Sequence, residues 1–257
     1  MSKVYFASDF HLGINGIETS SQREKRIVDW LESIRHDAEA IYLVGDLFDY
    51  WFEYSQAIPR GFVRLLGKLA DLRDSGIDIY AFTGNHDMWM FGYFEEELGI
   101  PVYREPIKRQ FNGKNFLIGH GDGLGPGDHG YKFIKKVFAS PVSQWLFARI
   151  HPNSGIRLMK YFSGQSRDMT SVPDFLGEDR EWLVQYAKDV LEKEEIDYFI
   201  FGHRHLPLDI TLNDRGSRYI NLGDWLSYYT YAVFDGDDVQ LKQLAVDGAK
   251  QVASLKK

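Results

Sequence analysis

The 257-residue sequence contains no cysteine. Disulfide bonds are therefore excluded, and any bound metal ion must be held by nitrogen and oxygen ligands. The sequence also lacks an apolar run near the roughly 18 residues that a membrane-spanning helix needs. No apolar segment with a basic flank, typical of a secretory signal, precedes the first strand-like run. We therefore expect a soluble, cytoplasmic protein, with peripheral contact to a membrane surface as an open alternative.

Acidic residues are missing from one long segment. The whole chain has a net charge of −7, which is untypical of a nucleic-acid-binding protein. Residues 131–167, however, contain seven lysines and arginines and no aspartate or glutamate, so the rest of the chain carries −14. This segment therefore concentrates positive charge. We expect no nucleic-acid partner.

Apolar periodicity divides the first half of the chain into alternating strands and helices. Helices are predicted over about 22–35 and 60–73, each with apolar residues at a spacing of three and four. Strand-like apolar runs stand before, between and after these helices. This β-α-β-α-β order predicts a largely parallel sheet with helices on its faces.

Turn signals change the pattern in the second half. Asn112-Gly113, Asp214-Arg215-Gly216 and Asp235-Gly236 each lie between β-rich runs and predict antiparallel hairpins. We therefore expect an α/β (α+β sandwich) fold in which two packed mixed β-sheets are flanked by helices. Residues 1–257 are predicted to form a single domain.

A helical insertion is predicted within this domain, at residues 123–170. Short helices are expected over 131–139, 142–150 and 156–162, with boundaries at Pro141, Pro152 and Gly155. A longer amphipathic helix over about 174–194 is assigned to the main fold. Because the insertion carries the seven clustered cations, we interpret it as a lid or cap.

Clusters of Asp, Asn and His follow five of the strand-like runs. In open α/β sheets, ligands bind at the edge where the strands end. Each motif alone is more often a turn or a surface histidine, but five of them at five strand ends favour a two-metal phosphoesterase site. The motifs are Asp9-Phe10-His11, Gly45-Asp46-Leu47-Phe48-Asp49, Gly84-Asn85-His86-Asp87, Gly119-His120-Gly121-Asp122 and Gly202-His203-Arg204-His205.

The predicted ligands form two groups that share one carboxylate. Side chains two residues apart on an extended chain point to the same side, so Asp-x-His and His-x-His can each converge on one site. A bridging carboxylate offsets the repulsion between cations about 3.5–4 Å apart. Mixed imidazole and oxygen donors favour Mn²⁺, Fe²⁺ or Zn²⁺ over Mg²⁺ alone, and we predict two ions of Mn²⁺. One ion is assigned Asp9, His11 and His205, the other Asn85, His120 and His203, and Asp46 bridges both.

Further catalytic and supporting groups are predicted around these ligands. His86 is assigned as a general acid, or as a cation-like donor to the departing oxygen, with Asp87 orienting it. The alternative for His86 is a structural hydrogen bond to a carboxylate. Asp49 and Asp122 are predicted to accept protons from ligand imidazoles.

From Asp9 to His205, the five motifs resemble the calcineurin-like metallophosphoesterase superfamily. The resemblance implies a two-sheet sandwich with helices outside and agrees with the ligand groups above. It also implies in-line attack on phosphorus by a hydroxide that bridges the metals. The retromer subunit with this fold is a binding scaffold, and such scaffolds tend to lose ligands or the catalytic histidine. Every position is filled here, which makes a scaffold a remote alternative.

The insertion resembles that of the UDP-2,3-diacylglucosamine diphosphatases, through residues 128–131, Pro141, Gln144, Phe147, Pro152 and residues 163–167. These enzymes act in lipid A biosynthesis and split a pyrophosphate to give UMP and 2,3-diacylglucosamine 1-phosphate. Better-known members carry Arg where this chain has His86, so a nucleotide phosphodiesterase or a general phosphatase stays open as an alternative. The resemblance implies substrate contacts by Asn85, Asp128, Tyr131, Ser163, Ser166, Arg167 and His203.

The composition of the insertion suits a lipid-linked phosphate. Apolar residues such as Phe133, Trp145 and Phe162 are interspersed with the cations, a pattern typical of a membrane interface or an anionic amphiphile. The alternative is ordinary packing of short helices with solvated Lys and Arg, which does not explain the absence of acidic residues. We therefore expect a nucleotide-linked glycolipid substrate and peripheral contact with the inner-membrane surface, and we make no prediction of oligomeric state.

Overall fold

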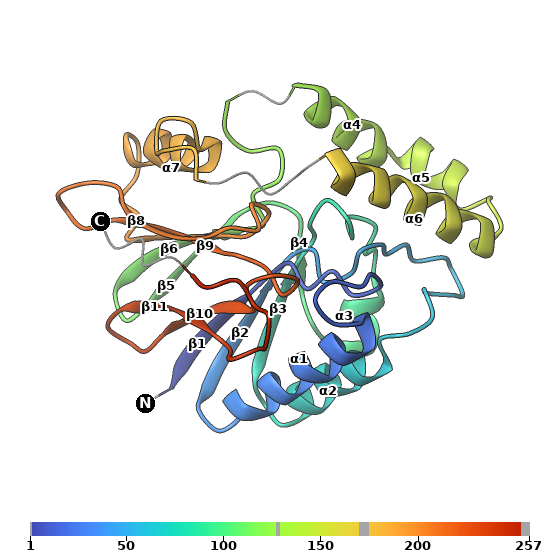
Figure 1. The fold of residues 1–257 in the computed structure, drawn as a ribbon, viewed down its shortest axis with the longest axis horizontal. Helices are drawn as coiled ribbons and strands as arrows, with labels where there is room; N and C mark the ends of the chain where they lie inside the picture. Colours follow the sequence, from blue (N-terminus) through green and yellow to red (C-terminus); the bar gives the residue numbers. More distant parts are fainter. Residues whose placement is uncertain (1, 127–128, 170–174, 253–257) are drawn as a thin grey trace.

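The computed structural model describes residues 2–126, 129–169 and 175–252. The chain forms two mixed β-sheets that pack face to face, with helices on the outer sides (Figure 1). The predicted sandwich is therefore confirmed. No helix among the described residues combines the length and the apolarity needed to cross a bilayer.

The first sheet is built mainly from the alternating half of the chain. Its elements are β1 (Lys3–Ala7), α1 (Ser20–Ile34), β2 (Ala38–Val44), α2 (Val63–Asp74), β3 (Asp78–Phe82), α3 (Tyr93–Leu98), β4 (Val102–Tyr103), β10 (Thr230–Phe234) and β11 (Val239–Gln243). The strand order is β11-β10-β1-β2-β3-β4. Strands β1 to β4 run parallel, as predicted, whereas β10 is antiparallel to both of its neighbours, β1 and β11. Helices α1 and α2 cover the outer face and bury Ile27, Leu31 and Leu69 there.

The second sheet comes from the later half. Its elements are β5 (Ile107–Phe111), β6 (Lys114–Gly119), α7 (Trp182–Leu191), β7 (Tyr198–Phe201), β8 (Pro207–Thr211) and β9 (Arg218–Leu222). The strand order is β5-β6-β7-β9-β8, parallel in the centre and antiparallel at both edges. All three predicted hairpins are present. Asn112 and Gly113 both have positive φ, 46° and 79°, as a tight two-residue hairpin turn requires.

Aromatic side chains fill the space between the sheets. Phe6 of β1 stacks on Tyr42 of β2 and, across the interface, on Phe116 of β6, with ring centroids 5.4 and 6.0 Å apart. Leu183 and Ala187 of α7 are buried on the other face of the second sheet. The core thus continues through both sheets, and the strand ends are held in fixed relative positions.

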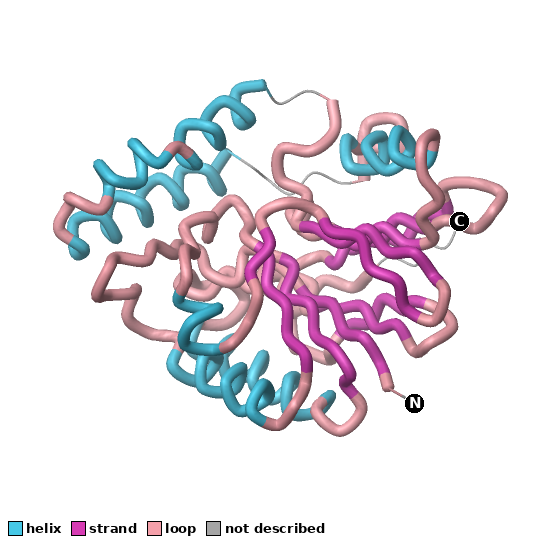
Figure 2. Tube along the Cα trace, turned by 180° about the vertical axis from the view of Figure 1, so that it is seen from behind, coloured by secondary structure: helices cyan, strands magenta, loops and turns pink. Residues whose placement is uncertain are grey.

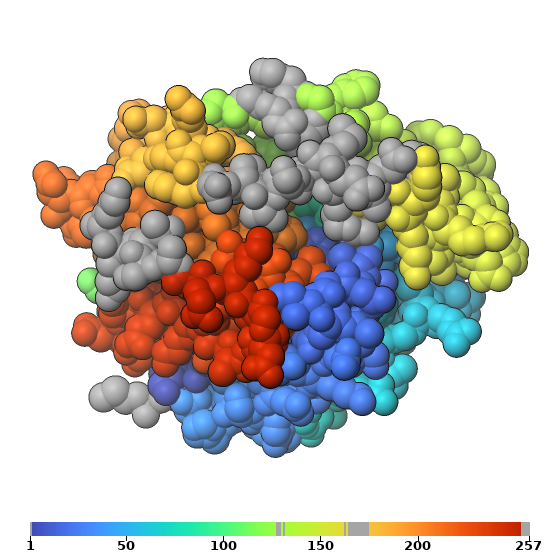
Figure 3. Space-filling model, viewed as in Figure 1, coloured from blue at the N-terminus to red at the C-terminus, as the bar shows by residue number. Residues whose placement is uncertain are grey.

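Three helices, α4 (His129–Ala139), α5 (Pro141–Phe147) and α6 (Pro152–Met169), form a layer at one end of the sandwich. We call residues 129–169 the cap (Figures 1 and 2). In Figure 3 the yellow and yellow-green surface of the cap projects at the right, above the cyan surface of the loop after β2. Phe147 anchors it, because its ring packs 4.8 Å from those of both Phe52 and Trp89.

Helices α6 and α7 differ in extent from the helices that the sequence predicts, and α6 spans Pro152–Met169 instead of 156–162. Helix α6 runs unbroken through Gly155. A Cβ atom at Gly155 would lie 2.7 Å from the Tyr54 hydroxyl oxygen, so this glycine serves close packing and does not end a helix. Helix α7 begins at Trp182, not near 174, with Glu181 as its N-cap residue.

Candidate metal centre

The seven predicted metal ligands come from the ends of strands in both sheets. In the first sheet, the segments after β1, β2 and β3 supply four of them. In the second sheet, those after β6 and β7 supply the other three. The first four are Asp9, His11, Asp46 and Asn85, and the last three are His120, His203 and His205.

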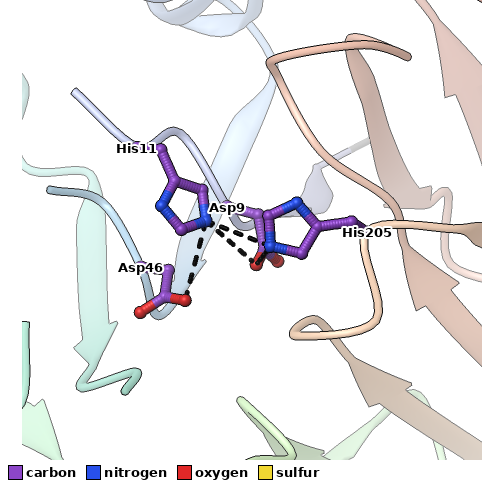
Figure 4. A group of neighbouring side chains, drawn as sticks. All are labelled: Asp9, His11, Asp46 and His205. Carbon is purple, nitrogen blue, oxygen red and sulfur yellow. Dashed lines mark hydrogen bonds and ion pairs between the residues drawn. The ribbon is translucent and has the colours of Figure 1, made fainter. Parts of the chain in front are cut away.

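Four of these side chains form the first cluster, shown in Figure 4. Asp9, His11, Asp46 and His205 each offer a ligand atom within 4.8 Å of the others. The His11 Nε2 atom lies 3.1 Å from His205 Nε2 and 3.6 Å from Asp46 Oδ2. The Asp9 Oδ1 atom lies 3.3 Å from His205 Nε2. Four donors thus surround one small volume.

The second cluster shares Asp46 with the first. Asp46, His120 and His203 form a group within the same 4.8 Å limit. His120 Nε2 lies 3.3 Å from Asp46 Oδ2. The amide oxygen of Asn85 lies 2.9 Å from His203 Nδ1 and 3.3 Å from His120 Nε2. Asp46 Oδ2 therefore lies between two sets of donors.

The ligands converge through left-handed backbone, not through the extended backbone that the sequence argument assumes. Asp9, His11, Asp46, His203 and His205 have φ angles between 43° and 66°, a region that costs a non-glycine residue about 1 kcal/mol or more. Backbone hydrogen bonds hold this geometry: Asp9 N–H donates to Gly45 O (3.0 Å) and His11 N–H to Asp46 O (2.9 Å). The assumption of an extended chain was therefore wrong, although the side chains do converge.

Glycines allow the loops to approach one another. A Cβ atom at Gly84 would lie 2.2 Å from Asp46 Oδ1, and one at Gly202 would lie 2.5 Å from Asp9 Oδ2. Contacts this short do not occur, so a side chain at either position would displace a carboxylate. Gly84 and Gly202, which directly precede Asn85 and His203, thus have a steric role.

The donor set fits divalent cations. Asp9 Oδ1 and Asp46 Oδ2 are buried and have no hydrogen-bond partner within the described part of the chain, an arrangement that is costly unless a cation is close. Burial lowers the pKa of His11, but Asp49, Asp9 and Asp46 outweigh this effect and raise it to about 10. The pKa of His120 also rises to about 10 against the effect of burial, chiefly through Asp46. The centre therefore attracts positive charge, which two metal ions would supply.

Partners outside the five motifs orient the ligand rings. His120 Nδ1 lies 2.9 Å from the Val44 carbonyl oxygen, and His205 Nδ1 lies 3.3 Å from Asp224 Oδ2. These are distances at which a ring N–H donates to an oxygen, which fixes the tautomer of a metal ligand. The sequence alone does not indicate these roles of Val44 and Asp224, because a main-chain oxygen has no residue-type signal and Asp224 lies in no motif.

Asp49 does not accept the ring proton of His11 as predicted, and Asp122 contacts the cap. Asp49 Oδ1 is 3.7 Å from His11 Nδ1, which is too long for a hydrogen bond. Asp122 forms an ion pair with Lys135 of α4 at 2.7 Å. The ion pair links the cap to the loop that carries His120.

Two buried arginines brace the ligand loops. Arg23 of α1 is fully buried, and its guanidinium donates to the carbonyl oxygens of Phe10 and His11, each at 2.8 Å. Arg204 lies between two ligands and forms a buried two-pronged ion pair with Glu181, at 2.9 and 3.0 Å. No sequence pattern distinguishes these two from solvated arginines, so their role could not be predicted from the sequence.

His86 lies beside the metal centre, next to His11. Their ring centroids are 4.8 Å apart, and the backbone N–H of His86 donates to Asp46 Oδ1 at 2.8 Å. His86 Nδ1 is 3.2 Å from the Asp49 carbonyl oxygen. Burial lowers the pKa of His86.

Asp87 does not orient the His86 ring as predicted. Its carboxylate accepts the backbone N–H groups of Gly84 and Leu47, each at 2.7 Å. It therefore ties the loop after β3 to the loop after β2. The adjacency in sequence was misleading, because the Asp87 side chain turns to the backbone.

The residues that the resemblance assigns to substrate fall into three sets. Asn85 and His203 lie within the metal centre. Ser163 of α6 is buried, with its hydroxyl beside Asp49 and His86. Asp128 lies outside the described residues, as do the side chains of Tyr131, Ser166 and Arg167.

Comparison with known proteins identifies the class. The profile of the calcineurin-like phosphoesterase family matches residues 2–207. The chain therefore belongs to this family, as the five motifs predicted. It is a hydrolase of phosphoric esters or anhydrides that depends on divalent metal.

Two relatives and one solved structure align with more than nine-tenths of this chain. The UDP-2,3-diacylglucosamine hydrolase of Porphyromonas gingivalis is 41% identical, with 95% of this chain and 98% of the relative covered. The enzyme of that name from Aeromonas salmonicida is 28% identical, with 93% and 92% covered. A solved structure of YfcE, a phosphoesterase from E. coli, covers 95% of this chain and 100% of its own, at 15% identity and a TM-score of 0.45.

Proposed function

We propose that the protein hydrolyses the pyrophosphate of UDP-2,3-diacylglucosamine to UMP and 2,3-diacylglucosamine 1-phosphate, a step of lipid A biosynthesis. The observation that carries hydrolysis is the Asp46 carboxylate shared by two clusters of donors. The choice of substrate is supported by the P. gingivalis and A. salmonicida relatives, which bear the name of this activity and align with more than nine-tenths of the chain.

Seven side chains are proposed to hold two metal ions, for which we favour Mn²⁺. When bound, the ions would supply an activated water and neutralise charge on the phosphoryl oxygens. Asp46 would hold both ions, because its Oδ2 atom lies within 3.6 Å of His11 Nε2 and 3.3 Å of His120 Nε2. Asp9, His11 and His205 would complete one site, and Asn85, His120 and His203 the other.

His86 is proposed to assist the departing oxygen. Its Nδ1 atom faces the Asp49 carbonyl oxygen, which can only accept a hydrogen bond, so the neutral ring carries its proton there. Nε2 is then the ring nitrogen available to exchange a proton, or to present the charge of a protonated ring, at the leaving group. Burial beside Asp46 and Asp49 keeps the ring in one orientation.

The cap is proposed to receive the lipid part of the substrate. Phe133, Trp145 and Tyr161 are 67%, 57% and 61% exposed. An open cavity of about 510 Å³, lined in part by Phe52, Phe91 and Trp145, lies between α5 and the loop after β2. Such surfaces suit acyl chains, and the basic side chains around them suit phosphate. We also propose that this protein is cytoplasmic and associates peripherally with the inner membrane.

Asp46→Ala tests the bridging role. Loss of a ligand common to both ions should reduce turnover by at least about 10³-fold, equivalent to about 4 kcal/mol of transition-state stabilisation. Turnover of UDP-2,3-diacylglucosamine with Mn²⁺, with products identified by mass, and metal content by elemental analysis are the measurements. Asp214→Ala, in an exposed turn, is the control. Near-normal turnover by Asp46→Ala would refute the bridge.

His86 favours one other function, a nucleotide phosphodiesterase, since histidine here is the general superfamily pattern. A competition assay separates the two. UDP-2,3-diacylglucosamine should outcompete bis-p-nitrophenyl phosphate and cyclic nucleotides, each with Mn²⁺. Faster turnover of the small diesters would transfer the assignment to the phosphodiesterase.

A further inference from the structure

A serine of the cap reaches His86, the histidine proposed to assist the departing oxygen. Ser163 lies in α6 and is 8% exposed. Its Oγ atom is 3.0 Å from Asp49 Oδ1 and 3.1 Å from His86 Nδ1. One hydroxyl group therefore joins the cap to a residue of the loop after β2 and to one of the loop after β3.

The chemistry of these neighbours fixes which group donates. The Asp49 carboxylate can only accept, so the Ser163 O–H donates to it. A hydroxyl has a single proton, so the Ser163 oxygen can then only accept from His86 Nδ1. The Asp49 carbonyl oxygen, 3.2 Å from the same nitrogen, also only accepts. Both neighbours thus require the proton of a neutral His86 to be on Nδ1.

One face of α6 brings Ser163 to this position. Ile156, Lys160 and Ser163 follow a spacing of four and three residues, which places them on the same side of the helix. Ile156 packs against the cluster of Phe52, Trp89 and Phe147, and it lines a cavity of about 90 Å³ together with Lys160 and Asp49. The contact of Ser163 therefore depends on how α6 lies against the main domain.

We propose that Ser163 is a positioning residue, whose hydroxyl orients His86 and holds its proton on Nδ1 when the cap is docked. This role differs from the substrate contact that resemblance implies. Through this contact, the position of the cap would determine whether the His86 ring is oriented to assist the leaving oxygen. The inference rests on the proposed role of His86 but not on the identity of the lipid substrate.

The test uses the Mn²⁺-loaded enzyme and two aryl phosphodiesters that differ in leaving group, p-nitrophenol and phenol. Ser163→Ala should lower kcat by about 10–100-fold with KM unchanged, as loss of an orienting partner does. The loss should be smaller with p-nitrophenol, a leaving group that needs less protonation. Ser163→Cys, which keeps the volume but is a weak donor, should behave like Ser163→Ala, and Ser163→Thr should restore the rate. Ser154→Ala, exposed on the same helix, is the control.

A double-mutant cycle with His86→Asn gives the decisive readout. If Ser163 acts through His86, adding Ser163→Ala to His86→Asn should lower kcat almost no further than His86→Asn alone does. A raised KM with unchanged kcat, or additive losses in the cycle, would overturn the inference. If His86→Asn leaves the rate unchanged, the role of His86 fails as well. If His86→Asn slows the reaction and neither Ser163→Ala nor Ser163→Cys does, only the role of Ser163 fails.

Discussion

The position of Asp46 depends on a neighbouring residue that has no side chain. A Cβ atom at Gly84 would approach Asp46 Oδ1 to 2.2 Å and its backbone nitrogen to 2.6 Å. The carboxylate cannot move aside freely, because Oδ1 accepts the His86 N–H and Oδ2 lies between the two clusters. A methyl group here is therefore incompatible with the geometry of both proposed metal sites.

Gly84→Ala should accordingly abolish most activity, with a loss of about 10²-fold or more. Bound metal should fall below two ions per chain, as measured by elemental analysis. The matched control is Gly67→Ala, within α2, where a Cβ atom meets nothing within 4 Å. That change should leave activity intact and stabilise the helix by about 0.5–1 kcal/mol. Full activity of Gly84→Ala with two bound ions would contradict the steric argument.

Two of the four predicted ligand histidines, His11 and His120, also predict a dependence on pH. Their pKa values are raised from an ordinary 6.5 to about 10, so the protonated rings stabilise the metal-free fold. This stabilisation is complete below about pH 6.5 and is lost as the pH rises through 10. Metal ions must displace these protons, so metal affinity should rise over the same range.

Urea denaturation of chelator-treated protein tests this pH dependence. The free energy of unfolding should fall between pH 7 and 9 by about 1 kcal/mol per pH unit for each ring. With metal bound, the rings no longer hold those protons, and the slope should largely disappear. Equal slopes with and without metal would show that the two rings are neutral in the metal-free protein.

Among the secondary-structure elements, α7 supports the loop after β7. Glu181, the N-cap residue of α7, forms the buried ion pair with Arg204, which stands between His203 and His205. The Arg204 guanidinium also lies 5.6 Å from the centre of the Trp182 ring. The start of a helix on the outer face of the second sheet thus restrains two proposed ligands.

Glu181→Gln should therefore reduce both stability and metal affinity. Leaving a buried guanidinium without its carboxylate costs about 3–5 kcal/mol, and a displaced loop should weaken metal binding by about 10–100-fold. Thermal unfolding and calorimetric metal titration measure the two effects. Glu178→Gln removes an exposed partner of Lys188 and should change either quantity little. If both substitutions have equal effects, the pair does not support the loop.

Elements with strong periodicity or turn chemistry could be predicted from the sequence. The strands before the five motifs and the Asn112-Gly113 hairpin are examples. The uninterrupted α6 could not be predicted, because the requirement for Gly155 comes from tertiary contacts with Tyr54, which is distant in sequence, and with Phe147 of α5. The start of α7 at Trp182 similarly depends on a tertiary contact, that of Glu181 with Arg204.

The candidate site, too, could be predicted from the sequence only in part. Residue types that bind metal are recognisable at strand ends, so the sequence indicates which side chains gather there. It does not show what orients them. Asp87 turns to backbone N–H groups, Asp224 faces His205 from another loop, and Ser163 arrives from the cap.

For the whole molecule, charge is distributed unevenly. The segment 131–167 carries +7 and the rest of the chain −14. Exposed basic side chains of the cap, such as Lys136 and Arg157, stand near exposed Phe133 and Trp145 in the sequence. A surface of this kind should bind anionic bilayers and leave neutral ones largely unbound.

Vesicle sedimentation tests that expectation. Binding to vesicles with anionic lipid should weaken as salt is raised, and Lys136→Glu and Arg157→Glu should each reduce it about fivefold or more. The charge reversal Lys25→Glu, exposed on α1 away from the cap, should have little effect. Equal losses for all three variants would indicate a general charge effect and not a membrane-facing cap.

The origin of the seven predicted ligands in two different sheets has a consequence for the whole sandwich. Four follow strands of the first sheet and three follow strands of the second. Ions held there would therefore cross-link the two sheets at one end of the sandwich. Resistance to denaturation then becomes a function of free cation concentration, gaining about 2.7 kcal/mol for one site at a hundredfold excess over Kd. In a cell short of the metal, the protein would therefore lose conformational stability as well as catalytic activity.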